Sequence, residues 1–135
     1  MKVCDADIAA VPVENLHVPL GEFAEVWAAA EVRARIDWFG CGVAVTCRWL
    51  ACATTRSDGQ PWHPSPAPVT QRTARRAMPE LIEQECLEAE KLALRSPVPE
   101  WLDDRPGWLD GVCATFDWAW RRTAPAPLTD ARPPI

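Results

Sequence analysis

The chain has 135 residues, of which 48% are hydrophobic and 24% are charged, and its formal net charge is −5. This length allows one domain with a real core and leaves no room for two domains of usual size. The acidic balance argues against broad binding of nucleic acid or of an anionic membrane, because both need a basic surface.

Residue usage indicates the base composition of the gene. Of the 14 basic residues, 12 are arginine and two are lysine, and the chain has eight tryptophans, one asparagine and no tyrosine. Arginine, alanine, glycine, proline and tryptophan have GC-rich codons, whereas lysine, asparagine and tyrosine have AT-rich codons. We therefore expect the protein to come from a GC-rich bacterium or from a phage of one.

Two further features predict the compartment. The N-terminal stretch MKVCDADIAAVPVENL contains Asp5 and Asp7 and lacks the long apolar run of a signal peptide. The most apolar run, residues 38–53, is 16 residues long and contains Arg48, whereas a membrane span needs about 20 residues. We expect a cytoplasmic protein with no membrane partner, in which the six cysteines are reduced thiols.

The first predicted elements are an arm and a helix. Residues 1–20 alternate only loosely between apolar and polar, and Pro12 and Pro19 interrupt them, so this segment is predicted as an irregular N-terminal arm or a short edge strand. Residues 22–38 form a predicted helix, because apolar residues recur there at spacings of three and four: Phe23, Trp27, Ala30, Ala34 and Trp38.

The pattern of residues 38–53 is compatible with two structures. Valine, cysteine and tryptophan alternate with smaller or polar residues from Val43 to Trp49, as they would in a strand. The length of the run and its alanine-rich end favour a buried helix, with Asp37 as its N-cap if the chain bends there. We adopt the helix and keep the strand as the alternative.

A loop and a second amphipathic helix follow. Four prolines and an Asp-Gly pair within residues 54–69 predict a loop, and residues 70–78 are compatible with one turn of helix capped by Thr70. Pro79 suits the first position of a helix over 79–95. In that helix a dense set of glutamates is predicted to form a solvated face: Glu80, Glu83, Glu85, Glu88 and Glu90.

A near-repeat precedes the last helix. The sequence PEWLDD at 99–104 returns as PGWLDG at 106–111, and both prolines suit a helix start. Because Pro106 forces the preceding residue out of helical geometry, we predict one turn at 99–104 and a separate helix at 106–122. In both copies the Trp-Leu pair is expected to point inward and the aspartate to stay in water.

These elements predict a mainly α, small single-domain bundle of three to four helices with a Pro-rich loop and irregular termini. The helices are 22–38, 38–53, 79–95 and 106–122, and they pack around a Trp-rich core. Residues 1–123 form the domain, and residues 124–135 form a Pro-rich flexible tail.

The pattern of reactive side chains does not predict an enzyme. The spacing of Cys41, Cys47 and Cys52 suits neither zinc nor a disulfide exchange motif, so these thiols are predicted as small buried hydrophobes. A Cys-His pair involving His17 or His63 has no local signature. No glycine-rich phosphate loop, carboxylate-histidine motif or calcium loop is present. We predict no catalytic residue, no metal and no cofactor.

Three groups remain as candidate binding residues. The stiff Pro-rich loop presents Trp62 and His63, which either contact a partner or, as we consider more favoured, fold back with Trp62 as a lid over the core. Trp101 is the tryptophan of the first repeat. Arg72, Arg75 and Arg76 form the basic cluster. Arg48, within an apolar run, requires an acidic partner.

The function predicted from these observations is a non-catalytic adaptor or regulator that binds another protein, possibly a second copy of itself. Trp is enriched at interface hot spots, and an interaction module should leave a contiguous patch of tryptophan exposed. One alternative is a small enzyme or ligand-binding protein with a pocket among the helices. The other is a DNA-binding regulator that uses the arginine cluster, although nucleic acid is the less favoured partner.

Overall fold

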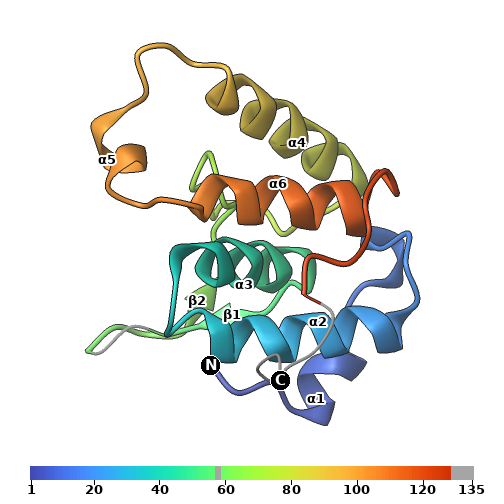
Figure 1. Ribbon diagram of the computed structural model, residues 1–135. Coiled ribbons are helices and arrows are strands. Elements are labelled where there is room, and N and C mark those ends of the chain that lie inside the picture. Colours follow the sequence, from blue (N-terminus) through green and yellow to red (C-terminus); the bar gives the residue numbers. More distant parts are fainter. Residues whose placement is uncertain (57–58, 129–135) are drawn as a thin grey trace, which may run out of the picture.

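Four long helices dominate the computed structural model, which describes residues 1–56 and 59–128 (Figure 1). They are α2 (Leu20–Arg33), α3 (Trp38–Leu50), α4 (Pro79–Ala93) and α6 (Trp108–Ala119), and the described residues also hold the short helices α1 (Asp5–Ala9) and α5 (Glu100–Asp103). The predicted mainly α class is therefore confirmed, and the alternative of a strand at residues 38–53 is wrong.

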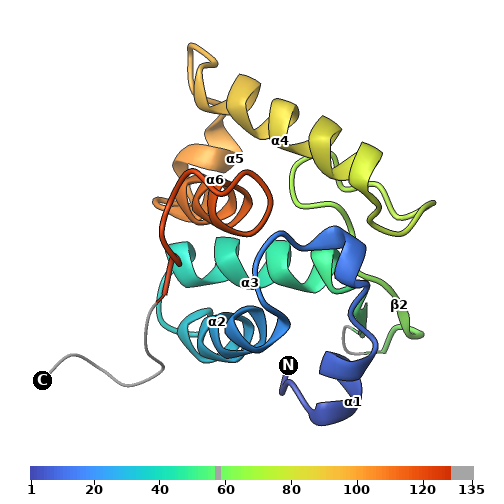
Figure 2. The same ribbon diagram turned by 90° about the vertical axis from the view of Figure 1, so that its right-hand side faces the viewer.

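The long helices are stacked in the order α2, α3, α6, α4 (Figure 2). In this view α2 and α6 are seen nearly end-on, whereas α3 and α4 run across the picture, so α3 crosses both of its neighbours steeply. The interior contains five of the eight tryptophans, as the sequence predicts for a Trp-rich core: Trp27, Trp49, Trp108, Trp118 and Trp120.

Two glycines bring α3 and α6 into direct backbone contact. A Cβ atom on Gly42 would lie 2.0 Å from the carbonyl oxygen of Trp108, and one on Gly111 would lie 2.3 Å from the carbonyl oxygen of Phe39. No larger residue fits at either position without moving a helix. The close approach sets the N-terminal end of α3 beside the N-terminal end of α6.

The chain bends between α2 and α3, so the helix predicted over 22–38 ends earlier, at Arg33. Asp37 is the N-cap of α3, as predicted, and its carboxylate accepts a hydrogen bond of 2.8 Å from the amide of Gly40. Trp38 therefore begins a new helix and does not continue the buried stripe of α2.

The N-terminal arm is more regular than predicted, because it contains α1 and the 3-10 turn η1 (Val13–Asn15). Asp7 stabilises the start of α1 by accepting hydrogen bonds from the amide and the thiol of Cys4. Asn15 is fully buried, and its Nδ2 donates to the carbonyl oxygens of Leu50 (2.9 Å) and Ala77 (3.0 Å). One side chain thus ties the arm to the end of α3 and to the residues before α4.

The Pro-rich loop contains one minimal antiparallel pair of strands. Strand β1 (Thr54–Thr55) pairs with β2 (His63–Pro64), with Thr55 opposite His63. The predicted helical turn over residues 70–78 is wrong, since no helix is present there. Thr70 does not cap a turn: its amide and hydroxyl both donate to Glu85 in α4.

The chain after α6 passes back toward α2 (Figures 1 and 2). Ala126 and Leu128 are half-buried against the core, so the described part of the predicted flexible tail 124–135 lies on the molecule. The rest of that prediction, residues 129–135, lies outside the described residues.

Candidate interaction surface

Two half-exposed tryptophans enclose an arginine at the end of the molecule where α3 and α6 begin. The guanidinium carbon of Arg105 lies 5.6 Å from the ring centroid of Trp38 and 5.6 Å from that of Trp101. Trp38 is 41% exposed and Trp101 is 43% exposed. We call these three residues the indole–guanidinium cluster. Both contacts are within cation–π range, so each ring holds the cation in place.

The glycine contacts between α3 and α6 account for the position of the cluster. Trp38 is the first residue of α3, and the α5 segment that carries Trp101 leads directly into α6. Trp101 rests edge-on against the buried Trp108, with ring centroids 5.9 Å apart. Because Trp108 lies at the close crossing of α3 and α6, this crossing supports the cluster.

The structure corrects two expectations for the near-repeat. Of the two tryptophans, Trp108 is buried and Trp101 is not, because the four-residue α5 lies outside the end of α6, whereas Leu102 and Leu109 both pack against the core. The last helix begins at Trp108 rather than at Pro106, since Gly107 before it adopts a left-handed φ of 92°. The predicted single turn at 99–104 is confirmed as α5.

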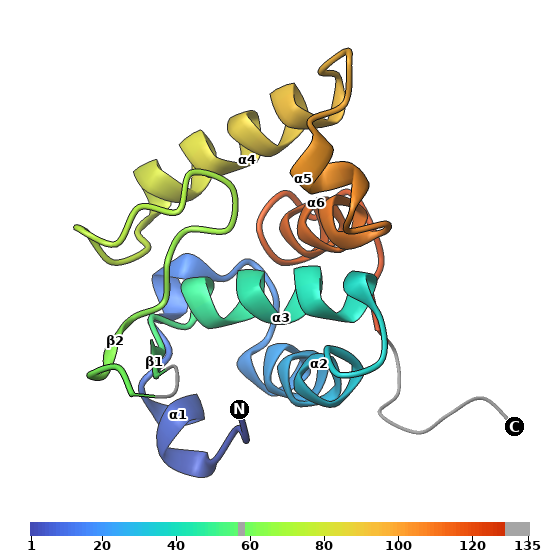
Figure 3. The same ribbon diagram turned by 90° about the vertical axis from the view of Figure 1, so that its left-hand side faces the viewer.

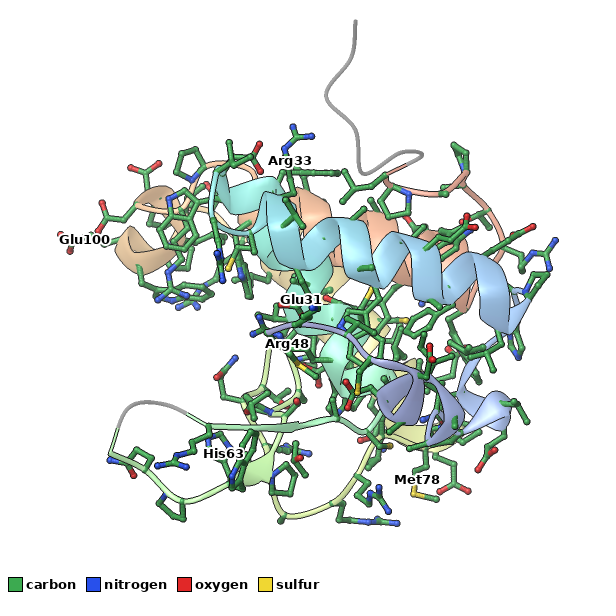
Figure 4. All side chains as sticks on the ribbon, turned by 90° about the horizontal axis from the view of Figure 1, so that it is seen from below. Glu31, Arg33, Arg48, His63, Met78 and Glu100 are labelled. Atoms are coloured by element: carbon green, nitrogen blue, oxygen red, sulfur yellow. The ribbon has the colours of Figure 1, made fainter. Side chains whose placement is uncertain are left out.

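Trp62 and His63 lie on a separate surface. Figure 4 shows His63 far from Glu100, the neighbour of Trp101, so the two exposed tryptophans named from the sequence do not form one patch. Trp62 is 66% exposed, and the favoured interpretation of a lid over the core is wrong. It borders a hollow of about 490 Å³ together with Lys2, Arg48 and Arg56.

The arginine cluster is divided. Arg72 and Arg75 line a pocket between the loop and α4, whereas Arg76 is not part of that lining. Arg75 donates to the thioether of Met78 at 3.0 Å. All three side chains are exposed, but they do not all line the same pocket.

Arg48 has the acidic partner that the sequence requires. Glu31, in α2, lies beside it (Figure 4) and accepts from its Nε at 2.7 Å and from a terminal nitrogen at 2.5 Å. The indole of Trp27 donates to the same carboxylate at 3.0 Å. The hydrogen bonds with Glu31 raise the pKa of Arg48, and the two residues form a structural link between α2 and α3.

The cysteines are poor nucleophiles apart from the exposed Cys4. All six are free thiols. Burial raises the pKa of Cys47, raises that of Cys86 to about 12 and that of Cys113 to about 11. Burial also raises the pKa values of Cys41 and Cys52. Since the thiolate is the reactive form, these residues are held in the inert form at neutral pH.

The histidines have backbone partners. His17 stacks on Trp120 with ring centroids 4.1 Å apart, and its Nδ1 donates to the carbonyl oxygen of that residue. The Nδ1 of His63 lies 3.0 Å from the carbonyl oxygen of Pro64. Within residues 1–56 and 59–128, neither histidine is hydrogen-bonded to a cysteine.

One glutamate of α4 departs from the predicted solvated face. Glu85 is 3% exposed and accepts hydrogen bonds from the amides of Val69 (2.7 Å) and Thr70 (2.8 Å) and from the Thr70 hydroxyl (3.0 Å). Glu85 also lines the pocket to which Arg72 and Arg75 contribute. The sequence signal that could have identified it is its place one turn after Leu81 and next to the buried Cys86.

Residues 1–56 and 59–128 contain no group of three or more histidine, cysteine or acidic side chains arranged to hold a metal ion. None of their helices combines the length and the apolar character that a membrane span requires.

Comparison of the chain with protein-family models, with curated proteins and with solved structures yields no match. Its function is therefore inferred from the geometry of its own residues.

Proposed function

We propose that the chain is a non-catalytic adaptor or regulator that binds another protein through the indole–guanidinium cluster. The supporting observation is the position of Arg105 between two indoles that each keep about two-fifths of their surface in water. Trp and Arg are the residue types most enriched at interface hot spots. Here they are already assembled before any partner arrives.

The preassembly favours binding because few rotamers remain to be ordered. Ordering a rotamer-rich side chain on association costs about 0.5–1.5 kcal/mol. The stacking on Trp38 and Trp101 has already restricted Arg105, the most flexible member of the cluster. The binding surface therefore consists of stiff, amphipathic groups, as hot spots require.

The charge of the cluster indicates what the partner presents. No carboxylate of the described residues forms an ion pair with Arg105. The guanidinium lies near both indole rings, but Arg105 is exposed and its N–H groups can donate to a carboxylate of a partner. We expect a partner with an apolar recess for the indoles and an acidic residue at its rim.

The proposed location is the cytoplasm, which the free thiols support because a reducing compartment preserves them. The origin in a GC-rich bacterium or phage rests on codon usage and stays a prediction. The DNA-binding alternative also stays a prediction: it requires affinity that collapses between low and moderate salt.

Capture of the partner from a lysate of the native host, with the full chain as bait, tests the proposal. Trp101→Ala and Arg105→Ala should each abolish capture of a protein that the wild type retains, while circular dichroism shows an unchanged fold. Trp62→Ala is the matched control, because it removes an exposed indole elsewhere. Capture that survives both cluster variants, or that is lost only in Trp62→Ala, would refute the proposed surface.

Self-association is an alternative outcome that the same variants can distinguish. If the partner is a second copy, analytical ultracentrifugation of the purified wild type shows dimers that Trp101→Ala converts to monomers. A monomeric wild type at all accessible concentrations would exclude this form of the proposal.

A further inference from the structure

A pocket lies between the segment that follows β2 and the first turns of α4. In Figure 3 this segment passes between α3 and α4 before α4 begins. The pocket has a volume of about 460 Å³, which is within the range of small-molecule sites. Trp49, Ala67 and Leu81 contribute an apolar lining, and Arg72, Arg75 and Gln84 contribute polar side chains.

The wall of this pocket is preformed. The buried carboxylate of Glu85 binds the amides of Val69 and Thr70 and the Thr70 hydroxyl, which fixes the loop to α4. Gln71 adopts a left-handed φ of 62°, and its side-chain amide donates to the carbonyl oxygens of Ala67 (3.2 Å) and Pro68 (2.8 Å). A loop held by these bonds does not need a ligand to take its shape.

The polar groups of the pocket are not all used by the protein. Arg72 and Arg75 form no ion pair with a carboxylate of the described residues. The indole nitrogen of Trp49, a residue 2% exposed, also has no acceptor among them. Buried polar groups are hydrogen-bonded in most proteins. An unpaired indole N–H on Trp49, a residue that lines the pocket, is therefore a reason to look for a ligand.

The charge balance selects the class of ligand. The lining has two guanidinium groups without a carboxylate partner and a single carboxylate, Glu85, whose oxygens already accept three hydrogen bonds. An anionic group can bind these guanidinium groups with charge-assisted hydrogen bonds. A flat apolar body can occupy the space against Trp49 and Leu81.

We infer that this pocket binds a small organic anion with a flat apolar body, such as an aromatic carboxylate, sulfonate or phosphate ester. The site is distinct from the indole–guanidinium cluster, and the inference does not depend on the proposed protein-binding function. It assigns to Arg72 and Arg75 recognition of a small ligand, in place of the DNA phosphates considered from the sequence.

Two dyes that share a ring system test the charge requirement. Anilinonaphthalene sulfonate carries an anionic group, and N-phenylnaphthylamine is its uncharged counterpart. Fluorescence titration should show that Arg72→Ala and Arg75→Ala each weaken binding of the sulfonate by roughly five- to tenfold, as expected for loss of one exposed charge-assisted hydrogen bond. Binding of the uncharged dye should change less than twofold.

Matched variants locate the bound dye. Arg76→Ala removes a neighbouring exposed arginine outside the lining and should leave both affinities unchanged. Trp101→Ala should also leave them unchanged, whereas Ala74→Phe, which narrows the pocket, should weaken both. In the wild type, titration with the sulfonate should shift the NMR resonance of the Trp49 indole N–H, assigned with Trp49→Phe.

Three results would overturn the inference. The first is that the wild type binds neither dye. The second is an equal loss of sulfonate binding in Arg76→Ala, which would show a general effect of charge. The third is loss of binding only in Trp101→Ala, which would place the dye on the cluster. Failure of the protein-capture experiment affects none of these measurements, so the two proposals can fail independently.

Discussion

At the scale of single residues, burial determines which thiols can react. We expect Cys4 to react rapidly with a thiol reagent at pH 8, because it is exposed. A thiol with a pKa of about 11, as at Cys113, is ionised at this pH to only about one part in a thousand, so Cys113 and Cys86 should react slowly. The reagent is Ellman's disulfide, and the readout is the amplitude of the fast phase.

In the wild type, concentrated guanidinium chloride should make all six thiols reactive, and Cys4→Ser should remove the fast phase of the native protein. Several rapidly reacting thiols in the native protein would contradict this account of burial.

The same pKa shifts have a consequence for stability. The folded pKa values lie above the ordinary value of 9.0, so thiolates form first in the unfolded chain. The free energy of unfolding should therefore fall as the pH rises above about 9.

The same scale shows where prediction from residues was limited. The need of Arg48 for an acid follows from its apolar neighbours, but its partner Glu31 is 17 positions away and belongs to another helix. Glu85 carries the same charge as the other glutamates of α4, and its burial depends on two amides of a distant loop. Sequence periodicity reports which face is apolar; it does not report which polar group a loop will cover.

At the scale of elements, the crossing of α3 and α6 depends on two glycines. Gly42→Ala should destabilise the protein by about 2 kcal/mol, because the new methyl group meets the carbonyl oxygen of Trp108, which cannot rotate away. Gly21→Ala is the control: its Cβ meets no atom within 4 Å, and alanine is the better helix former by up to about 1 kcal/mol. Urea unfolding should show opposite signs for the two variants, and equal effects would contradict this view of the crossing.

The start of α3 adds a dependence on pH. The hydrogen bond from the Gly40 amide, with a further contribution from Arg33, lowers the pKa of Asp37 below 3.8. The stabilisation from this carboxylate is present above pH 4 and is lost as the pH falls through the folded pKa. Asp37→Ala should cost about 1 kcal/mol at pH 7.

Asp37→Asn keeps an oxygen that can cap the helix but removes the charge. It should therefore lose less stability than the alanine variant at pH 7, and its stability difference from the wild type should shrink between pH 4 and pH 2. Denaturant unfolding across this range gives the comparison. A difference that stays constant with pH would show that the charge of Asp37 contributes nothing.

Three of the four main helices could be predicted from an apolar stripe at helical spacing. The pattern of α3 also fitted a strand, and the length of its run and its alanine-rich end favoured the helix; α3 and α4 also have a start signal in Asp37 and Pro79. Their ends were less predictable. Trp38 fits the stripe of α2 by spacing alone, and only the choice of Asp37 as a cap places it at the start of the next helix. This boundary decides whether the indole is in the core or in the candidate site.

At the scale of the whole molecule, one buried amide joins three distant segments. Asn15→Ala leaves the carbonyl oxygen of Leu50 without its donor and that of Ala77 with only the weak Cys52 thiol donor at 3.6 Å. Each buried unpaired group costs about 1–3 kcal/mol. We expect a loss of about 2–4 kcal/mol in urea unfolding. Hydrogen exchange should accelerate in η1 and around residues 50–53 and 77.

Glu14→Ala, at the exposed neighbouring position, should change the free energy of unfolding by less than about 0.5 kcal/mol. If Asn15→Ala behaves like this control, the arm does not hold the helices together. The contact could not be predicted from the sequence, because a single asparagine among apolar residues has no periodicity that would indicate its partners.

The two hydrogen bonds of Asn15 also hold the two ends of one long segment together. Since the carbonyl oxygens of Leu50 and Ala77 both accept from one nitrogen atom, the residues on either side of the 51–76 segment lie next to each other. This segment carries Trp62, Arg72 and Arg75. Substitutions at its exposed positions can therefore alter recognition while the hydrogen bonds of Asn15 keep both ends of the segment in place.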